Sequence, residues 1–312
     1  MATKRYEVEH QAIVRAPAEL AYRLIADVEN WSWLFPTTVH AQRLGGDDLG
    51  DRVGIWTTTD GTVNHWVALR RMDPRALTVA YRQEQSVAPV ADMGGAWVFE
   101  PRGERECRVR LLHDYRAIDD DPDTLGWIAE VLDRLSTDEL AAFRAGAELV
   151  AEDERRVLTF TDEITTDGTV ARVYGFLREM PLWVGRVPDL MDVQVLRDAD
   201  EVQWLRTTMA AGSGTYRSEL MRVCLTPDKI GYRYLVVPPL ARARTGLWRV
   251  CPEAGGARAS LRQTVVFDEP GIEAMLGSGA GLEQARNFAR RELGGDAAQI
   301  LAAVQAYAKE GS

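Results

Sequence analysis

Cysteine, histidine and lysine are all scarce in this chain of 312 residues. Its three cysteines, Cys107, Cys224 and Cys251, have no C-x-x-C spacing, so we expect reduced thiols packed inside the protein rather than disulfides or a zinc site. The four histidines and the carboxylates show no spacing that is typical of a metal centre. We therefore expect neither a metal ion nor another cofactor.

Long apolar runs, a G-x-S-x-G motif and an excess of positive charge are absent as well. No stretch of about 18 apolar residues occurs, so we expect no membrane span, and the N-terminal residues lack the apolar run of a signal peptide. The net charge of −10 argues against nucleic acid as a partner, because phosphate binding needs concentrated positive charge. We expect a cytoplasmic protein without the nucleophilic serine of α/β-hydrolases.

What the sequence does contain is one internal repeat. Offsets of 152 and 151 residues bring rare residues of the two halves together, and these pairs are Tyr22 with Tyr174, Trp31 with Trp183, Arg70 with Arg222, and Trp97 with Trp248. A repeat of about 150 residues is far longer than the period of a solenoid and indicates duplicated domains. We expect these domains at 1–150 and 156–312, joined by the polar segment 151–155.

Both halves predict the same order of elements: a strand, two helices, six strands and a long helix. Pro17 favours a helix start, because the first helical turn needs no amide donor. In the first half the strands are expected at 6–14, 39–44, 51–59, 62–72, 76–87, 94–101 and 106–118, with a turn at Asp60 and Gly61 and a last helix over 124–150 that contains a capping box at 136–139. In the second half we expect a strand at 156–165, a helix at 170–179, strands within 190–268 and a last helix at 282–309.

This order of elements predicts an α+β fold with an interior cavity in each domain. A meandering antiparallel sheet twists and curls, and one amphipathic helix laid across its concave face cannot fill the whole groove. The remaining space is an apolar pocket, the usual kind of small-molecule site. Aromatic residues are expected to line it, with plain core packing as the alternative for each, and they are Trp31, Phe35, Trp56, Trp66, Trp97 and Tyr115 in the first half and Trp183 and Trp248 in the second.

Three segments carry a resemblance to a known family. The run from Arg15 through Trp31 to Pro36 resembles the polyketide cyclase branch of the START/Bet v1-like helix-grip superfamily. Residues 66–71 are similar to that branch's strand with its pocket arginine, and residues 95–97 match the strand tryptophan near it. Together with the duplication, they resemble the di-domain aromatase/cyclases of bacterial type II polyketide synthases.

The resemblance implies a reaction on a poly-β-ketone chain that is held by an acyl carrier protein, alongside the other synthase subunits. The pocket is expected to fold the chain, to promote aldol closure of the first ring between carbons seven and twelve of a ketoreduced chain, and to assist dehydration to an aromatic ring. The pocket arginine corresponds to Arg70 and, through the internal repeat, to Arg222. Thr38, Ala68 and His113 stand where single-domain members have tyrosine, serine and glutamine, which puts the proton-transfer group in doubt.

The chemistry gives these residues definite candidate roles. A guanidinium in an apolar pocket stabilises the negative oxygen that develops in an aldol reaction, because it stays charged while water is excluded. Strand parity does not decide whether Arg70 points inward, because residues on both faces of its strand are apolar. His113 is a candidate general base or acid, with a packed strand histidine as the alternative. The matching positions of His113 and Tyr115 in the second half are Val265 and Phe267, so no equivalent titrating group follows there, and we expect the active centre in the first domain.

Two other functions remain open: a non-catalytic carrier of a hydrophobic small molecule, and a bracing role for one degenerate domain. A carrier needs a neutral apolar pocket, whereas a cyclase needs an arginine directed at bound carbonyl oxygens. For docking of an acidic carrier protein, six arginines of the second half are candidates, with solvated side chains as the alternative: Arg242, Arg244, Arg249, Arg286, Arg290 and Arg291. The second half suits this role better, since residues 1–150 hold 17 Lys and Arg against 25 Asp and Glu, and the rest holds 20 against 22.

Overall fold

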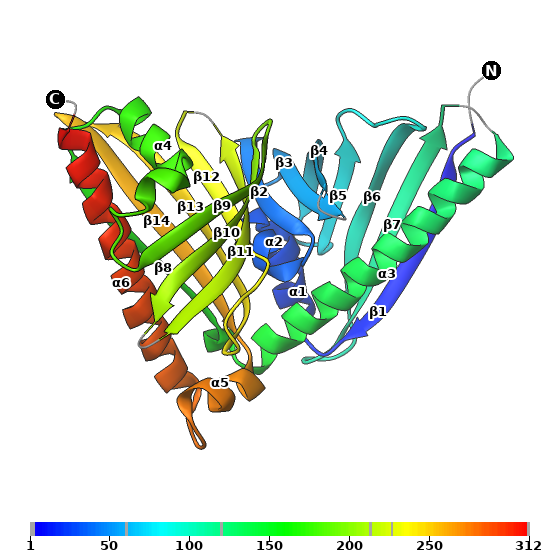
Figure 1. Ribbon diagram of the computed structural model, residues 1–312. Coiled ribbons are helices and arrows are strands. Elements are labelled where there is room, and N and C mark those ends of the chain that lie inside the picture. Colours follow the sequence, from blue (N-terminus) through cyan, green and yellow to red (C-terminus); the bar gives the residue numbers. More distant parts are fainter. Residues whose placement is uncertain (1–3, 60–61, 119–120, 212–213, 226, 311–312) are drawn as a thin grey trace. The chain divides into compact units, whose positions relative to one another are not determined.

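The computed structural model describes residues 4–59, 62–118, 121–211, 214–225 and 227–310, so the turn expected at Asp60 and Gly61 lies outside the described residues. The chain divides into two compact units, Met1–Glu154 and Arg155–Ser312, each with one antiparallel sheet and one long helix (Figure 1). This confirms the predicted class of two tandem helix-grip domains.

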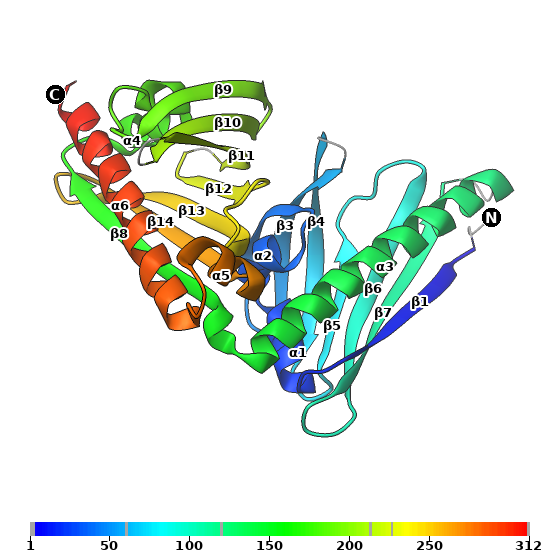
Figure 2. The same cartoon turned by 60° about the horizontal axis from the view of Figure 1, so that its bottom comes forward.

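The first domain is a seven-stranded antiparallel sheet in the order β1-β7-β6-β5-β4-β3-β2. Its last helix, α3 (Pro122–Glu152), lies across one face of that sheet (Figure 2). The other elements are β1 (Tyr6–Val14), α1 (Ala18–Ala26), η1 (Val28–Asn30), α2 (Trp31–Leu34), β2 (Thr38–Gly46), β3 (Gly50–Thr59), β4 (Thr62–Asp73), β5 (Thr78–Gln83), β6 (Val90–Pro101) and β7 (Cys107–Ala117).

The second domain repeats this design with its strands in the order β8-β14-β13-β12-β11-β10-β9. One helix, α5 (Glu269–Leu276), was not predicted; it precedes the long helix α6 (Leu282–Lys309). The others are η2 (Glu154–Arg156), β8 (Val157–Thr166), α4 (Val170–Arg178), η3 (Met180–Trp183), β9 (Leu190–Ala199), β10 (Val202–Ala211), β11 (Gly214–Leu225), β12 (Lys229–Tyr234), β13 (Ala241–Glu253) and β14 (Gly256–Phe267).

Local sequence explains why the long helix of the first domain begins and packs where it does. The Asp121 side chain accepts a hydrogen bond from the Thr124 amide at 2.9 Å, and Pro122 occupies the first turn. Buried residues then recur at helical spacing along the face that meets the sheet, namely Ile128, Leu132, Ser136, Leu140, Phe143 and Ala147. This face closes the concave side of the sheet and decides which strand residues become interior.

Register between strands separates the two faces of the first sheet. Asp51, Val53 and Ile55 of β3 pair with Arg70, Ala68 and Trp66 of β4, and residues directly opposite each other share a face. Leu69 is on the other face and is 48% exposed, whereas Arg70 is 4% exposed. Arg70 therefore points into the domain, which the apolar residues on both faces of its strand had left undecided.

Three further findings concern the whole chain as described. No helix within the described ranges is long and apolar enough to cross a membrane. All three cysteines are free, with Cys107 and Cys224 buried. Across the same ranges, no three His, Cys, Asp or Glu side chains are grouped so that they could hold a metal ion.

Candidate active site

Arg70 is the centre of a buried arrangement that we call the first clamp: Arg70, the Asp51 carboxylate, and the carbonyls of Ile25 and Ala26. Nε and Nη2 of Arg70 donate to the two oxygens of Asp51 at 2.8 and 2.6 Å. Nη1 donates to Ile25 O and Nη2 to Ala26 O, both at 3.1 Å. Four of its five N–H groups are thus committed to the protein.

The first clamp fixes the end of α1 to the sheet. A helix leaves its last carbonyls without partners inside the helix, and Arg70 satisfies two of them. The Trp31 indole N–H also donates to Ile25 O at 3.0 Å, and its ring lies 5.4 Å from the Arg70 guanidinium carbon. The family resemblance implies an arginine that acts on the substrate, whereas here most of the guanidinium holds structure.

The second domain builds the same arrangement without the acid. This second clamp consists of Arg222, Gln203, and the carbonyls of Leu177 and Arg178. Arg222 donates to Arg178 O and Gln203 Oε1 at 3.1 Å and to Leu177 O at 2.5 Å. Gln203 lies 152 residues after Asp51, so an amide takes the place of a carboxylate. Among the described residues no carboxylate forms an ion pair with Arg222, and burial lowers its pKa.

A second interior group lies toward α3 and consists of Tyr81, His113, Ser136 and Glu139. The rings of Tyr81 and His113 are 6.0 Å apart, edge to face. His113 Nδ1 is 3.4 Å from Ser136 Oγ of α3. Burial lowers the pKa of His113 to about 4, so the imidazole is neutral at physiological pH. Because the interior penalises the charged form, His113 fits the alternative of a packed strand histidine better than a general base or acid.

Glu139 was not predicted as a site residue. Its side chain is half-buried on the inner side of α3, and burial raises its pKa to about 7. Burial raises the pKa of Tyr81 well above its ordinary value, and the charge of Glu139 adds to this effect. Tyr81 therefore remains a neutral phenol. A carboxyl group with a pKa of about 7 can both accept and donate a proton at neutral pH, so Glu139 is equipped for proton transfer.

Gly95 makes room for this group. It pairs with Tyr81 on β5 and with His113 on β7, and a Cβ at this position would collide with the Leu112 carbonyl oxygen and contact the Tyr81 hydroxyl. Gly246 of the second domain pairs in the same way with Tyr232 and would collide with its ring. The close approach of a tyrosine to the backbone is thus built into both domains.

The strand register corrects the internal match of His113. Because Gly246 faces Gln263 across β13 and β14, the counterpart of His113 is Gln263, and that of Tyr115 is Val265. The predicted matches, Val265 and Phe267, were two residues too late. The second domain therefore carries a polar group here, although not one that titrates.

Most of the aromatic candidates are interior, but they belong to different groups. Phe35 and Trp97 are 6.1 Å apart, Trp31 and Phe35 6.0 Å, and Trp183 and Trp248 6.4 Å. Tyr115 stacks on Tyr6 of β1, and Trp66 is partly buried against the cluster around Val53. Trp56 is a correction: it stacks on His65, on the sheet face opposite Val53 and Ile55.

Comparisons with known proteins place this geometry in a family. Residues 5–148 match the family model "Polyketide cyclase / dehydrase and lipid transport". The granaticin polyketide synthase bifunctional cyclase/dehydratase of Streptomyces violaceoruber is 34% identical over 92% of this chain and 89% of its own, and the actinorhodin counterpart of Streptomyces coelicolor is 33% identical over 95% of both. The crystal structure of the di-domain ARO/CYC BexL from the BE-7585A pathway superposes with a TM-score of 0.89, at 36% identity over 97% of this chain and 98% of that one.

The chain belongs to the di-domain polyketide aromatase/cyclases. Polyketide cyclisation and aromatisation are therefore its class of activity. A second structure, the di-domain ARO/CYC StfQ from the steffimycin pathway, agrees with a TM-score of 0.86 at 28% identity over 97% of this chain and 98% of that one. Both structures cover the two domains, so the tandem arrangement is part of the family's design.

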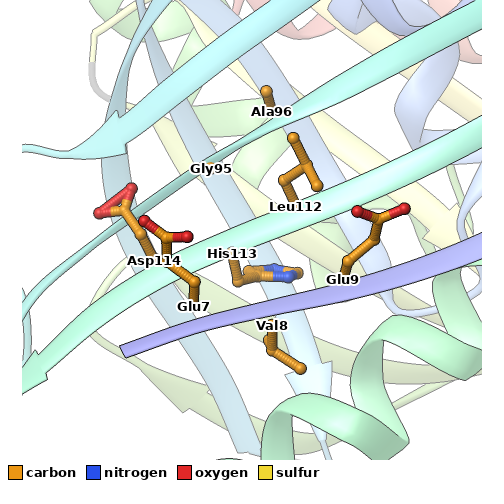
Figure 3. A pocket seen from close by; sticks show the side chains of 8 residues that line it. All are labelled: Glu7, Val8, Glu9, Gly95, Ala96, Leu112, His113 and Asp114. Atoms are coloured by element: carbon orange, nitrogen blue, oxygen red, sulfur yellow. The ribbon is translucent and has the colours of Figure 1, made fainter. Parts of the chain in front are cut away.

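One surface hollow of this aromatase/cyclase lies in the first domain (Figure 3). Its volume is about 420 Å³, and it spans β1, β6 and β7. Glu7 and Asp114, which pair across β1 and β7, lie on one side, with Glu9 on the other. These carboxylates belong to the sheet face opposite α3, whereas His113 is directed to Ser136 of α3. Because carboxylates repel a negatively charged enolate, this hollow does not suit such a ligand. It is also separate from the interior group around His113.

The expected docking arginines of the aromatase/cyclase are less available than predicted. Arg244 is only 8% exposed and lies inside the second domain, which is a correction. Arg286 donates to the carbonyls of Arg155 and Val157, and Arg290 pairs with Asp162 at 2.6 Å. Arg291 pairs with its neighbour Glu292 at 2.9 Å. These partners reduce the free positive charge that the surface presents.

Proposed function

We propose that the protein folds an acyl-carrier-protein-bound, ketoreduced poly-β-ketone of a type II polyketide synthase and closes its first ring between carbons seven and twelve. The same site then assists dehydration to the aromatic ring. The relatives named as cyclase/dehydratases support this reaction class. The observation that carries the proposal is a carboxyl group with a pKa of about 7, Glu139, whose charge acts on the neutral phenol of Tyr81 inside the first domain.

In the aldol step, the ionised Glu139 carboxylate removes an acidic proton from a methylene between two carbonyls. The resulting carbanion forms a carbon–carbon bond to a ketone carbon, and the electron pair of that carbonyl moves to oxygen. Tyr81 donates a hydrogen bond to the developing alkoxide, because a phenol held neutral by burial is a donor where charge appears. The proton on Glu139 can then be returned to this oxygen.

Dehydration uses the same group in both of its forms. Loss of water requires removal of a proton from the carbon beside the new alcohol and delivery of a proton to the departing hydroxyl. A carboxyl group with a pKa near the working pH serves as base and then as acid without a large energetic penalty in either step. Neutral His113, held by Ser136, contributes a hydrogen bond rather than a charge.

Arg70, Arg222 and the aromatic residues take supporting roles in this proposal. Each arginine holds the end of a short helix beside a tryptophan, Trp31 in the first domain and Trp183 in the second. These helices and tryptophans form the wall against which the chain folds. A carrier function needs no titrating carboxyl at this position, so Glu139 favours catalysis.

Reconstitution of a minimal synthase, a ketoreductase and the full chain tests this function by product identification. Glu139→Gln should lower formation of the first aromatic ring by about 100-fold or more, the range expected for loss of a general acid–base group. The matched control is Glu130→Gln, an exposed glutamate on the same helix, which should react as the wild type does. Equal yields from all three proteins, or a first ring closed at other carbons, would refute the proposal.

A further inference from the structure

The interior of the second domain carries a buried cation that the first domain lacks. Arg244 on β13 is 8% exposed, and its Nη2 donates to Gln263 Oε1 at 3.3 Å. Its Nε is buried without a hydrogen-bond partner, and among the described residues no carboxylate forms an ion pair with it. A buried guanidinium with a free donor is costly unless something else binds it.

Three phenols and one carboxyl group act electrostatically on this guanidinium and together raise its pKa despite its burial. With Arg244 and Gln263 they form what we call the Arg244 cluster. The guanidinium carbon of Arg244 lies 4.4 Å from the centre of the Tyr234 ring, and Tyr232 and Tyr234 are 5.8 Å apart, edge to face. Tyr232 also donates to Gln263 at 3.5 Å. The cluster is Arg244, Tyr216, Tyr232, Tyr234, Gln263 and Asp296, and the charges of Arg244 and Asp296 both act on Tyr216.

The cluster reaches the surface on one side. Tyr216 is 38% exposed, and Tyr234 and Asp296 are half-buried, although Arg244 and Tyr232 behind them are buried. Burial raises the pKa of Asp296, and the charge of Arg244 only partly opposes this. Among the described residues no ion pair joins Asp296 to Arg244, whereas Asp51 pairs directly with Arg70 at 2.6 Å.

The residues of the Arg244 cluster have counterparts in the first domain, and only the position of Arg244 differs in charge. Gly95 and Gly246 are equivalent, so Arg244, two residues before Gly246, corresponds to Met93. The pairs Tyr81 with Tyr232 and His113 with Gln263 follow from the same register. Glu139 and Asp296 correspond as well, because an offset of 157 aligns buried helix positions, for example Leu140 with Ala297 and Ala147 with Val304. Only the second domain adds a cation.

We propose that the Arg244 cluster is a second ligand site, which binds the ionised oxygen of an enolised β-diketone or of a phenol. The free Nε donates to the anionic oxygen, the guanidinium compensates its charge, and the tyrosines contact the flat conjugated part. The inference rests on the proposed function for the source of such ligands, because cyclisation consumes the first kind and forms the second. The first domain handles neutral carbonyls, and the second holds the acidic enol or phenol.

Titration of a phenolic dye on the full chain tests this site. The probe is 1,8-dihydroxyanthraquinone, whose visible absorption moves to longer wavelength when a phenol ionises. Bound to the wild type, the dye should ionise at a pH at least one unit lower than in water, since a cation within hydrogen-bond reach favours the anion by tenfold or more. Arg244→Met, which copies Met93, should remove this change and weaken binding of the ionised dye about tenfold.

Two further variants separate charge from structure. Arg244→Lys keeps the cation and should keep part of the lowered ionisation pH. Arg242→Met removes an exposed arginine of the same strand and should behave as the wild type. No binding of the dye, unchanged ionisation on binding, or equal effects of Arg244→Met and Arg242→Met would each overturn the inference.

Product formation by the same variants distinguishes this inference from the proposed function. A wild type that lacks the dye effect but cyclises normally contradicts the Arg244 site alone. A wild type that binds and ionises the dye but does not close the first ring contradicts the proposed function alone. Circular dichroism of each variant confirms that differences in dye binding do not come from unfolding.

Discussion

Substitution at the first clamp should affect folding of the first domain before it affects chemistry. The Arg70 and Asp51 side chains are 1% and 0% exposed, and Arg70 also satisfies two carbonyls at the end of α1. In Arg70→Met, Asp51 stays buried with only one remaining bond from Arg43, at 3.1 Å. Removing one partner of a buried ion pair costs about 3–5 kcal/mol, so we expect this variant to lose a large share of the domain's stability.

The second clamp suggests a second substitution, Asp51→Gln, that should offset part of the loss of stability in Arg70→Met. Arg222 is held by Gln203 and two carbonyls without any acid, so Asp51→Gln should leave Arg70 with the same kinds of partners. The double variant Arg70→Met with Asp51→Gln buries no charge and leaves mainly one unsatisfied carbonyl, at about 1–3 kcal/mol. It should therefore be more stable than Arg70→Met alone, with a coupling of about 2 kcal/mol.

Amide hydrogen exchange of α1 in the full chain measures these differences locally, which suits a two-domain protein that need not unfold in one step. Exchange should be fastest in Arg70→Met, intermediate in the double variant and slowest in the wild type. The reasoning would be wrong if Arg70→Met exchanged like the wild type, or if adding Asp51→Gln to it accelerated exchange further. In either case the charge pair would not hold the end of α1.

Other substitutions test the remaining interior groups of the first domain. The rate of first-ring closure should rise with pH through about 7 in the wild type, and this limb should be absent in Glu139→Gln; a limb that persists contradicts the role of Glu139 as base. The raised pKa of Glu139 favours folding below the ordinary glutamate pKa and loses that contribution as the pH rises through about 7, so Glu139→Gln should gain relative stability between pH 5 and 8 in thermal melts. His113→Gln should keep the pH–rate limb and should resist acid unfolding better between about pH 6.5 and 4, where the unfolded state alone binds the imidazole proton. Gly95→Ala should destabilise the first domain by several kcal/mol, about the cost of overpacking against backbone, whereas Gly103→Ala, in an open turn with a positive φ, should cost less.

The repeat and the helix-grip architecture could be predicted because they leave signals in the sequence. Rare residues such as Trp31 and Trp183 recur at one offset, and alternation marks the strands. In the strand of Arg70, however, alternation could not predict which face is interior, since Val67 and Leu69 are as apolar as Trp66. Only pairing with β3 decides the face, and pairing joins residues that are far apart in the chain.

The residues that surround Arg70 and His113 could not be predicted from the sequence for a different reason. Asp51 aligns with Gln203, which is a different residue type. The internal repeat therefore gave no sign that Asp51 neutralises Arg70. Glu139 follows Ser136 in a segment that matches a capping box, yet α3 runs through it uninterrupted and turns Glu139 inward. Its match to Asp296 is hidden because the offset between the halves changes from 150 residues on β7 and β14 to 157 on the long helices, with the extra helix α5 inserted between them.

The buried charges of the second domain argue against a merely bracing role for it. A brace needs apolar packing, and replacing buried ionic groups with packed apolar residues is often neutral or stabilising. Arg222 and Arg244 instead bury two guanidinium groups for which no described carboxylate forms an ion pair. Burial lowers the pKa of Arg222; burial also acts to lower that of Arg244, but the nearby tyrosines and Asp296 together raise it above the ordinary value. The second clamp accounts for Arg222 through the helix carbonyls that it binds. The Arg244 Nε has no hydrogen-bond partner within the described residues, and the anionic ligand that we propose would supply the missing acceptor.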